Sequence, residues 1–133
     1  MTLSRVPPAL PPVVETLVER TIGACIEVHR QLGPGLLEAT YSCAIGIELA
    51  ARGIVFVRER SVPVSYRGHP IAHQRIDVVV DEQLILEVKS ADCLAPIHVA
   101  QLISYLKLTR LHVGLLVNFN VPILKQGLRR IVL

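Results

Sequence analysis

The sequence is poor in the residues that nucleic-acid bases stack on and in those that cross-link small secreted folds. Of its 133 residues, 4% are aromatic and none is tryptophan, which argues against a base-stacking platform of the kind that binds single strands. Its three cysteines, Cys25, Cys43 and Cys93, are odd in number and match no metal or redox spacing. We therefore expect small buried residues in a reducing compartment rather than disulfides or a zinc site.

Long hydrophobic runs are missing too. Although 51% of the residues are hydrophobic, no run approaches the ~18 to 20 residues that cross a bilayer, so the sequence predicts no membrane span. The first twelve residues contain four prolines and lack the apolar core of a signal peptide. We expect an extended, proline-rich lead-in over residues 1–12, a single domain over residues 13–133 and a cytoplasmic protein. The apolar excess is also compatible with a homo-oligomer.

Hydrophobic periodicity predicts an α/β fold with the order helix, helix, three strands, helix, strand. The predicted helices cover residues 13–32, about 36–52 and 95–109, and the predicted strands cover residues 54–68, 71–80, 84–90 and 111–119. Gly33-Pro34-Gly35 ends the first helix, and Pro63 is a candidate break in the first strand. Residues 124–133 are ambiguous, with a short closing strand as one alternative.

The third predicted strand, LILEVKS, carries two charges in an otherwise apolar stretch. Charges are costly inside a sheet unless they are paired, solvated or bound to a metal. A tight turn joins this strand to the one before it, and the resulting hairpin places Asp77 opposite Glu87 and Arg75 opposite Lys89. Side-chain alternation puts these four residues on one face. The other face is entirely apolar and consists of Ile76, Val78, Val80, Leu84, Leu86 and Val88.

Two carboxylates directly opposite each other destabilise a plain hairpin, so the pairing of Asp77 with Glu87 needs a cause. A divalent cation is one, because Mg²⁺ takes one or two carboxylates and leaves its other positions to water and substrate phosphate. Lys89 beside it would orient an attacking water or stabilise charge on a phosphoryl group, which fits metal-assisted phosphodiester hydrolysis. The alternative is a solvated face on which Arg75 and Lys89 neutralise the two acids in an ion-pair cluster.

Two predicted helices offer further polar groups, and each group has a plain structural alternative. Glu38 opens the second helix, where an acid also suits the helix dipole, and it shares a stripe with Tyr41. Gln101 and Tyr105 lie four residues apart and therefore share a face of the third helix. Without a site, they are a polar residue at the edge of an apolar stripe and a core tyrosine.

The stretch GPGLLEATY at residues 33–41 resembles the signature of the GxxExxY proteins, which are assigned to the PD-(D/E)XK nuclease superfamily. Glu-x-Lys alone is a weak signal, whereas the ordered set of Gly-x-x-Glu, Asp, Glu-x-Lys and Gln-x-x-x-Tyr is specific. One departure from the superfamily name is Ile76, which stands where the name has proline. The resemblance covers roughly residues 13–133 and continues through RID (75–77), LEVK (86–89), HVAQLISYLK (98–107), VGLLVNF (113–119) and LRRIV (128–132).

The resemblance implies a restriction-endonuclease-like core, in which a mixed β-sheet is flanked by helices, and a nuclease site. It implies that Mg²⁺, for which Mn²⁺ can substitute, is bound by Asp77, Glu87, the carbonyl of Val88 and Glu38. Lys89 would assist the attacking water. The Gln-x-x-x-Tyr motif of lambda exonuclease and RecB-type enzymes adds Gln101 and Tyr105 to the implied catalytic residues.

Nucleic acid, with DNA preferred, is the implied partner, and a net charge of +3 permits a polyanion. The chain is close to a minimal core, so nucleic-acid contacts would come from the cleft rim and from scattered basic residues, each of which is otherwise an ordinary surface charge. These are Arg58, Arg60, Arg67, Lys107, Arg129 and Arg130. The main interpretation is a Mg²⁺-dependent nuclease. The alternative is a non-catalytic domain that binds nucleic acid or protein. A metal-independent esterase lacks a serine nucleophile in a convincing elbow.

Overall fold

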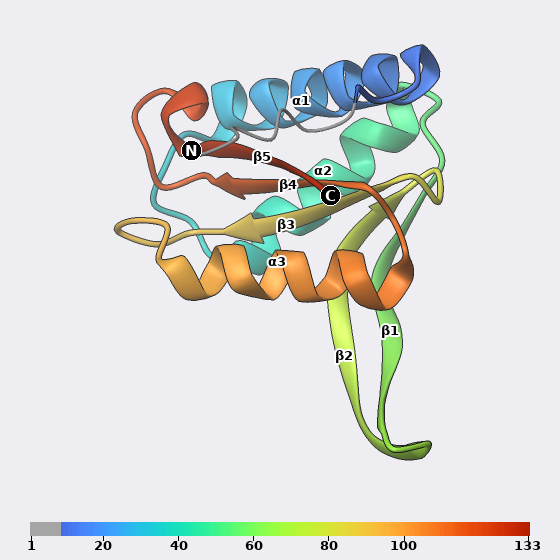
Figure 1. Cartoon of the computed structure of the whole chain (residues 1–133). Helices are drawn as coiled ribbons and strands as arrows, with labels where there is room; N and C mark the ends of the chain where they lie inside the picture. The colour runs from blue at the N-terminus through green and yellow to red at the C-terminus, as the bar shows by residue number, and fades with distance from the viewer. Residues whose placement is uncertain (1–8) are drawn as a thin grey trace, which may run out of the picture.

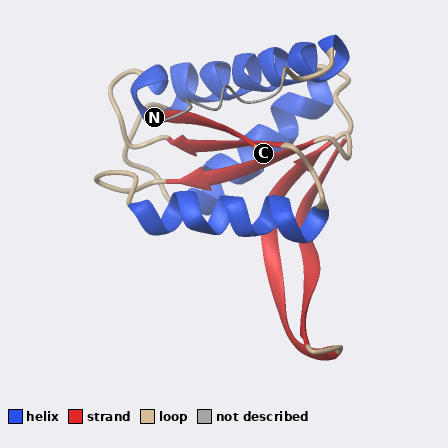
Figure 2. Cartoon of the chain, in the orientation of Figure 1, coloured by secondary structure: helices blue, strands red, loops and turns tan. Residues whose placement is uncertain are grey.

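A five-stranded mixed sheet lies between helices in the computed structural model, which describes residues 9–133 (Figures 1 and 2). The strands follow one another across the sheet in chain order. β3 and β4 run parallel, while the other neighbouring pairs run antiparallel. The elements are α1 (Pro12–Leu32), α2 (Glu38–Ala51), β1 (Phe56–Tyr66), β2 (His69–Val80), β3 (Leu84–Lys89), α3 (Pro96–Thr109), β4 (Val113–Asn118), the 3₁₀-helix η1 (Leu124–Gly127) and β5 (Leu128–Val132).

This order confirms the predicted α/β fold, and the ambiguous end of the chain does close with a short strand, β5. β1 runs through Pro63 without a break, because it is an edge strand and an edge strand can accommodate a proline. α1 begins at Pro12, one residue before the predicted start, since the missing N–H of a proline costs nothing in the first helical turn. Most of the predicted extended lead-in, residues 1–8, lies outside the described residues.

Apolar side chains fill both faces of the sheet. On one face, α1 and α2 cover the larger cluster, which includes Leu17, Ile45 and Leu86. On the other face, α3 covers a smaller cluster around Ile85 and Leu102, and Figure 2 shows the helices on the two sides. β3 and β4 are therefore buried on both faces, which explains why their sequences are nearly continuous apolar runs.

The structure bears on two expectations from composition, the lack of a membrane span and the burial of the cysteines. No helix within residues 9–133 is both long and apolar enough to cross a bilayer. Cys25 is buried, as expected, but Cys43 and Cys93 are exposed. The expectation of burial is wrong for these two because Cys43 lies on the solvent side of α2 and Cys93 lies in the loop before α3.

Tyr41 holds the loop between α1 and α2 in place. Its hydroxyl donates a hydrogen bond to the carbonyl oxygen of Gly33 at 2.5 Å and accepts one from the N–H of Leu36 at 3.1 Å. The side chain is fully buried, and its ring stacks on Phe119 with the ring centroids 4.5 Å apart. Because Glu38 is the first residue of α2, these two hydrogen bonds of Tyr41 also help to fix the position of the Glu38 backbone.

We expect Tyr41→Phe to lower the free energy of unfolding by about 1–3 kcal/mol, because the substitution removes the partner of two backbone groups near the core. Urea denaturation measures the difference. Tyr66→Phe is the matched control, since Tyr66 is 65% exposed near the hairpin tip and its hydroxyl should matter by less than about 0.5 kcal/mol. Equal midpoints for the two variants would show that these two hydrogen bonds of Tyr41 contribute nothing.

Candidate active site

β2 and β3 separate just before the charged residues. Their ladder covers three pairs and ends with Val78 opposite Leu86, in the predicted register. Beyond this point β2 continues beside β1, whereas β3 continues beside β4. The sheet therefore forks, and Asp77 is the first residue of β2 beyond the last pair.

Asp77 lies in the fork between the two strands. Its Oδ2 accepts a hydrogen bond from the N–H of Val88 at 2.8 Å. The Asp77 side chain thus supplies the acceptor for a backbone N–H of β3 at a point where β2 is no longer paired with β3. The predicted placement of Arg75 opposite Lys89 is wrong. β2 has left β3 by then, and Arg75 is paired only on the other edge of β2, with Ser61 of β1.

An irregularity in β1 accompanies the fork. Glu59 has a left-handed backbone conformation with φ 55°, which non-glycine residues rarely adopt. The ladder of β1 with β2 steps from the pair Arg58–Val78 to the pair Arg60–Ile76, with no pair recorded between them. Ile76 consequently packs in the cluster under α3, whereas Val78 packs under α1 and α2. The prediction that these two side chains share a face is wrong, because strict alternation breaks at this position.

Glu87 is a buried acid, with 3% of its surface exposed. Burial, reinforced by the neighbouring Asp77 carboxyl group, raises the pKa of Glu87 from its ordinary value of 4.5 to about 9, and Lys89 only partly opposes this. Within residues 9–133, neither acid forms an ion pair, and Arg75 lies 3.8 Å from Glu59 instead. The alternative of a solvated ion-pair cluster is therefore wrong.

α3 brings Gln101 and Tyr105 to the side of the sheet on which Glu87 and Lys89 lie. The ammonium group of Lys89 donates a hydrogen bond to Oε1 of Gln101 at 3.3 Å. Tyr105 is buried, and its pKa is raised by burial and by the charges of Glu87 and Asp77. Both α3 residues also line a cavity of about 490 Å³ against β1 and β2.

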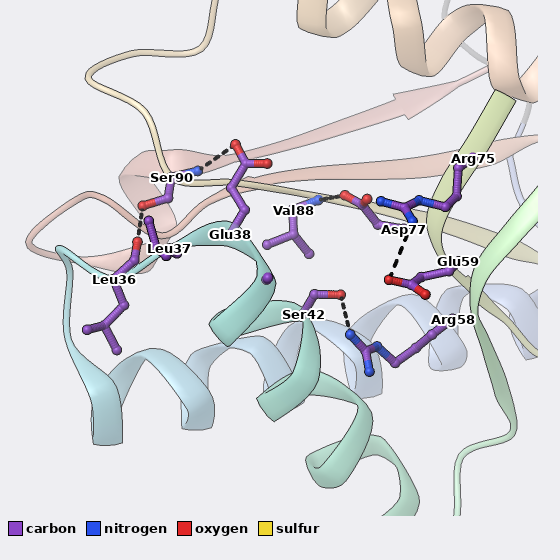
Figure 3. A pocket seen from close by; sticks show the side chains of 11 residues that line it. Leu36, Leu37, Glu38, Ser42, Arg58, Glu59, Arg75, Asp77, Val88 and Ser90 are labelled. Atoms are coloured by element: carbon purple, nitrogen blue, oxygen red, sulfur yellow. Dashed lines mark hydrogen bonds and ion pairs between the residues drawn. The ribbon is translucent and has the colours of Figure 1, made fainter.

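A second cavity, of about 500 Å³, opens beside Asp77 and is lined by Glu38, Val88 and Ser90 among others (Figure 3). Glu38 stands at the N-terminus of α2, and its Oε1 accepts a hydrogen bond from the N–H of Ser90 at 3.4 Å. The Ser90 hydroxyl donates to the carbonyl oxygen of Leu36 at 2.6 Å. We call this hollow the Asp77 cavity.

The predicted site residues thus form two groups that meet at Asp77. Glu87, Lys89, Gln101 and Tyr105 lie toward α3, whereas Glu38 and Val88 line the Asp77 cavity. In the part of the chain that the structure describes, no three histidine, cysteine, aspartate or glutamate side chains form a ready group of metal ligands. The pair of Asp77 and Glu87 is brought together, while Glu38 as a third ligand stays a prediction.

Sequence reasoning missed three polar residues of the cavity wall, Ser42, Glu59 and Ser90. Ser90 directly follows Glu-x-Lys and Ser42 lies one turn after Glu38, so proximity to the motifs was the one available signal. The structure also separates the six basic residues. Arg58 lines the Asp77 cavity, Arg60 pairs with Glu82, Arg67 lies over the Tyr66 ring, Arg130 pairs with Glu15, and Lys107 and Arg129 line other cavities.

The raised pKa of Glu87 predicts how stability depends on pH in metal-free buffer. A carboxyl whose folded pKa is about 9 and whose ordinary value is 4.5 binds its proton more tightly when folded. Its contribution to stability is therefore complete below pH 4.5, the ordinary pKa, and is lost as the pH rises from there through the folded pKa of about 9. We expect Glu87→Gln, which mimics the protonated acid, to remove a fall of up to about 1.4 kcal/mol per pH unit in this window.

Thermal melts of both proteins in chelator between about pH 5 and pH 9 test this linkage. The control is Glu82→Gln, because Glu82 is an exposed acid in the turn between the same two strands and its pKa is lowered by Arg60. With Glu82→Gln, stability should still fall as the pH rises, as it does in the native protein. Parallel curves for the native protein and Glu87→Gln would show that Glu87 is ionised in the folded state.

Comparison with known proteins agrees with this geometry. The family model of the PD-(D/E)XK nuclease superfamily matches residues 15–131, a span that contains every predicted site residue. Searches of curated proteins and of solved structures found no match. The mixed sheet flanked by helices is the restriction-endonuclease-like arrangement that the sequence predicts. On the extent of the family match, this chain belongs to the PD-(D/E)XK nuclease superfamily.

Proposed function

We propose that this protein is a divalent-cation-dependent nuclease that hydrolyses phosphodiester bonds, with DNA as its substrate. The observation that carries the proposal is the acid pair at the fork between β2 and β3, in which Glu87 is buried and Asp77 half-buried, with Lys89 beside it. Burying two acids together is costly unless something compensates for them. Membership of a nuclease superfamily supports the same activity.

The donor set at the fork fits a hard divalent cation. Carboxylate and carbonyl oxygens are the ligands that Mg²⁺ prefers, and one or two carboxylates suffice when water and substrate phosphate supply the rest. We infer that Asp77, Glu87, the carbonyl oxygen of Val88 and Glu38 would hold Mg²⁺ or Mn²⁺. When bound, such a cation activates a water and neutralises charge on the phosphoryl group.

The remaining residues of the chain would orient the reacting groups. The ammonium group of Lys89 would position the attacking water or stabilise negative charge that develops on the phosphoryl oxygens. Gln101 is a positioning residue in this scheme, because its Oε1 holds the Lys89 ammonium at 3.3 Å. Tyr105 is buried on the α3 side, where the charge of Glu87 helps to raise its pKa, and would act as a neutral hydroxyl beside the acids.

Within the superfamily, we infer that the chain is one of the GxxExxY proteins. The spacing of Gly35, Glu38 and Tyr41 supports this assignment. The structure gives two of these residues complementary tasks, since Tyr41 braces the loop before α2 and Glu38 presents its carboxylate to the Asp77 cavity.

A second candidate is a non-catalytic domain that binds nucleic acid or a partner protein. It is favoured by the lack of a ready three-ligand group within residues 9–133, and by the engagement of Glu38 with the backbone of Ser90. Cation binding and cleavage separate the two candidates, because the non-catalytic domain requires neither.

We expect Asp77→Asn to abolish cleavage while the fold survives. Labelled single- and double-stranded DNA, and RNA, are incubated with Mg²⁺, with Mn²⁺ or with chelator. The native protein should cleave DNA only with the cation, and Asp77→Asn should cleave at least about a hundredfold more slowly because a group that stabilises the transition state is gone. Asp81→Asn is the matched control, since Asp81 is exposed in the turn after β2 and lies outside the site.

Calorimetric titration with Mn²⁺, with and without an uncleavable oligonucleotide, supplies the second readout. Saturable binding by the native protein and by Asp81→Asn, but not by Asp77→Asn, is the expected result. Equal binding in all three proteins, together with no cleavage of any substrate, would contradict the nuclease and favour the non-catalytic domain. Thermal melts in chelator should show Asp77→Asn to be no less stable than the native protein, because the asparagine oxygen can still accept from the Val88 N–H and the substitution removes the repulsion that arises when Glu87 ionises.

A further inference from the structure

Arg58 differs from the arginines of this protein that form ion pairs with acids. Arg30, Arg52, Arg60, Arg75 and Arg130 each form an ion pair with a nearby glutamate, but Arg58 forms none within residues 9–133. Its guanidinium donates a single long hydrogen bond, from Nη2 to the Ser42 hydroxyl at 3.4 Å. Its Nε is buried and has no hydrogen-bond partner. An unsatisfied buried donor is destabilising, more so on a charged group, so Arg58 requires an explanation.

The place of Arg58 in the wall of the Asp77 cavity suggests why its guanidinium lacks a partner. Arg58 lines the Asp77 cavity together with Asp77 itself and Glu38 (Figure 3). Neither acid lies within ion-pairing distance of its guanidinium in the described structure. A second arginine of the cavity wall, Arg75, pairs with Glu59, so Arg58 is the cavity arginine that lacks an anion in the described structure. A planar guanidinium with free N–H groups matches the oxygens of a phosphate better than any other side chain does.

α2 is shaped to admit this arginine. Gly46 lies in the middle of α2, where glycine is unfavourable compared with alanine. A Cβ at this position would come within 3.0 Å of Cδ of Arg58 and 3.3 Å of the Phe56 ring. The missing side chain thus leaves room for the stem of Arg58 to pass over the helix and reach the cavity.

We propose that Arg58, given its path by Gly46, binds a non-bridging phosphate oxygen of the nucleic-acid backbone in the Asp77 cavity. The inference rests on the proposed function, and it assigns a binding role to one of the six basic residues. Arg58 holds the phosphodiester group on the α2 side of Asp77, while Lys89 lies on the α3 side. A free nucleoside monophosphate offers the same oxygens, so the experiment must distinguish the two sources.

The test measures binding of a labelled DNA oligonucleotide in chelator, with Asp77→Asn as the reference so that no cleavage occurs. Adding Arg58→Gln should weaken binding by about tenfold to a hundredfold, as expected for the loss of a charge-assisted hydrogen bond. It should also reduce the slope of log affinity against log salt by about 1. Arg30→Gln is the matched control, because it removes the same charge at a different place, on α1, where Arg30 pairs with Glu27.

A nucleoside monophosphate is then used as the competitor. If the site reads backbone phosphate, the monophosphate displaces the oligonucleotide only weakly, and Arg58→Gln affects oligonucleotide binding more strongly than monophosphate binding. Equal weakening by Arg58→Gln and Arg30→Gln would show a general charge effect and would overturn the proposal. Unchanged binding with a lower melting temperature would make Arg58 a structural residue and would overturn it as well.

Gly46→Ala provides an independent variant that keeps the charge. Helix propensity favours the alanine, and the Arg58 stem is flexible enough to move aside, so the protein should stay folded. We expect weaker oligonucleotide binding, because the guanidinium is displaced. Gly23→Ala in α1 is the matched control, since its Cβ would meet only Nη1 of Arg52, at 3.1 Å. Native affinity in Gly46→Ala would overturn the role given to Gly46.

Failure of this inference and failure of the nuclease proposal give different results. If the native protein cleaves DNA and Arg58→Gln, made alone, cleaves it with the same KM and kcat, the inference fails and the nuclease stands. If the native protein cleaves nothing but binding still depends on Arg58, the nuclease fails and the phosphate site stands. No binding of the oligonucleotide by the reference protein overturns the phosphate site, whatever the cleavage assay shows.

Discussion

The proximity of the Asp77 and Glu87 carboxyl groups is the constraint on which the rest of this structure depends. Burial and the neighbouring Asp77 both disfavour the charged form of Glu87. The two acids are tolerated here because the sheet forks beside them, which gives Asp77 a backbone donor at Val88 and an open cavity to face. The fork in turn requires β2 to leave β3 early, while β1 stays paired along the other edge of β2 and β4 stays paired along the other edge of β3.

Asp77 also connects the two layers that cover the sheet. Toward α3 it influences Glu87 and Tyr105, and toward α2 it lines a cavity with Glu38 and Arg58. Reaching both sides is unusual for a strand residue, whose side chain ordinarily points to one face. The left-handed Glu59 and the interrupted pairing beside it show where the backbone departs from regular geometry to allow this. Strain of this kind is commonly found at functional sites.

Much of this could be predicted from the sequence, and the rest could not for identifiable reasons. Periodicity predicted the order of elements, and the tight turn before Leu84 predicted the register of β2 with β3. Arg75 and Ile76 were misplaced because the prediction extended that ladder past Val78, where β2 leaves β3 and stays paired only with β1 on its other edge. The motifs predicted candidate site residues, but not their division between two sides of the sheet, which depends on where the ladder stops. Nor could spacing reveal that Arg58, one of two arginines in the cavity wall, would lack an acid.

The parallel pairing of β3 with β4 has a consequence for how the molecule folds. β1, β2 and β3 are joined by tight turns and can form as a local meander, whereas β4 reaches β3 only after the long connection through α3 has closed. Contacts of greater sequence separation form more slowly. Glu87 is therefore covered, and Lys89 meets Gln101, only after the connection through α3 has closed. A chain in which α3 and β4 had not yet docked would leave Glu87 in water with its ordinary pKa, so this acid takes up its proton as the connection closes.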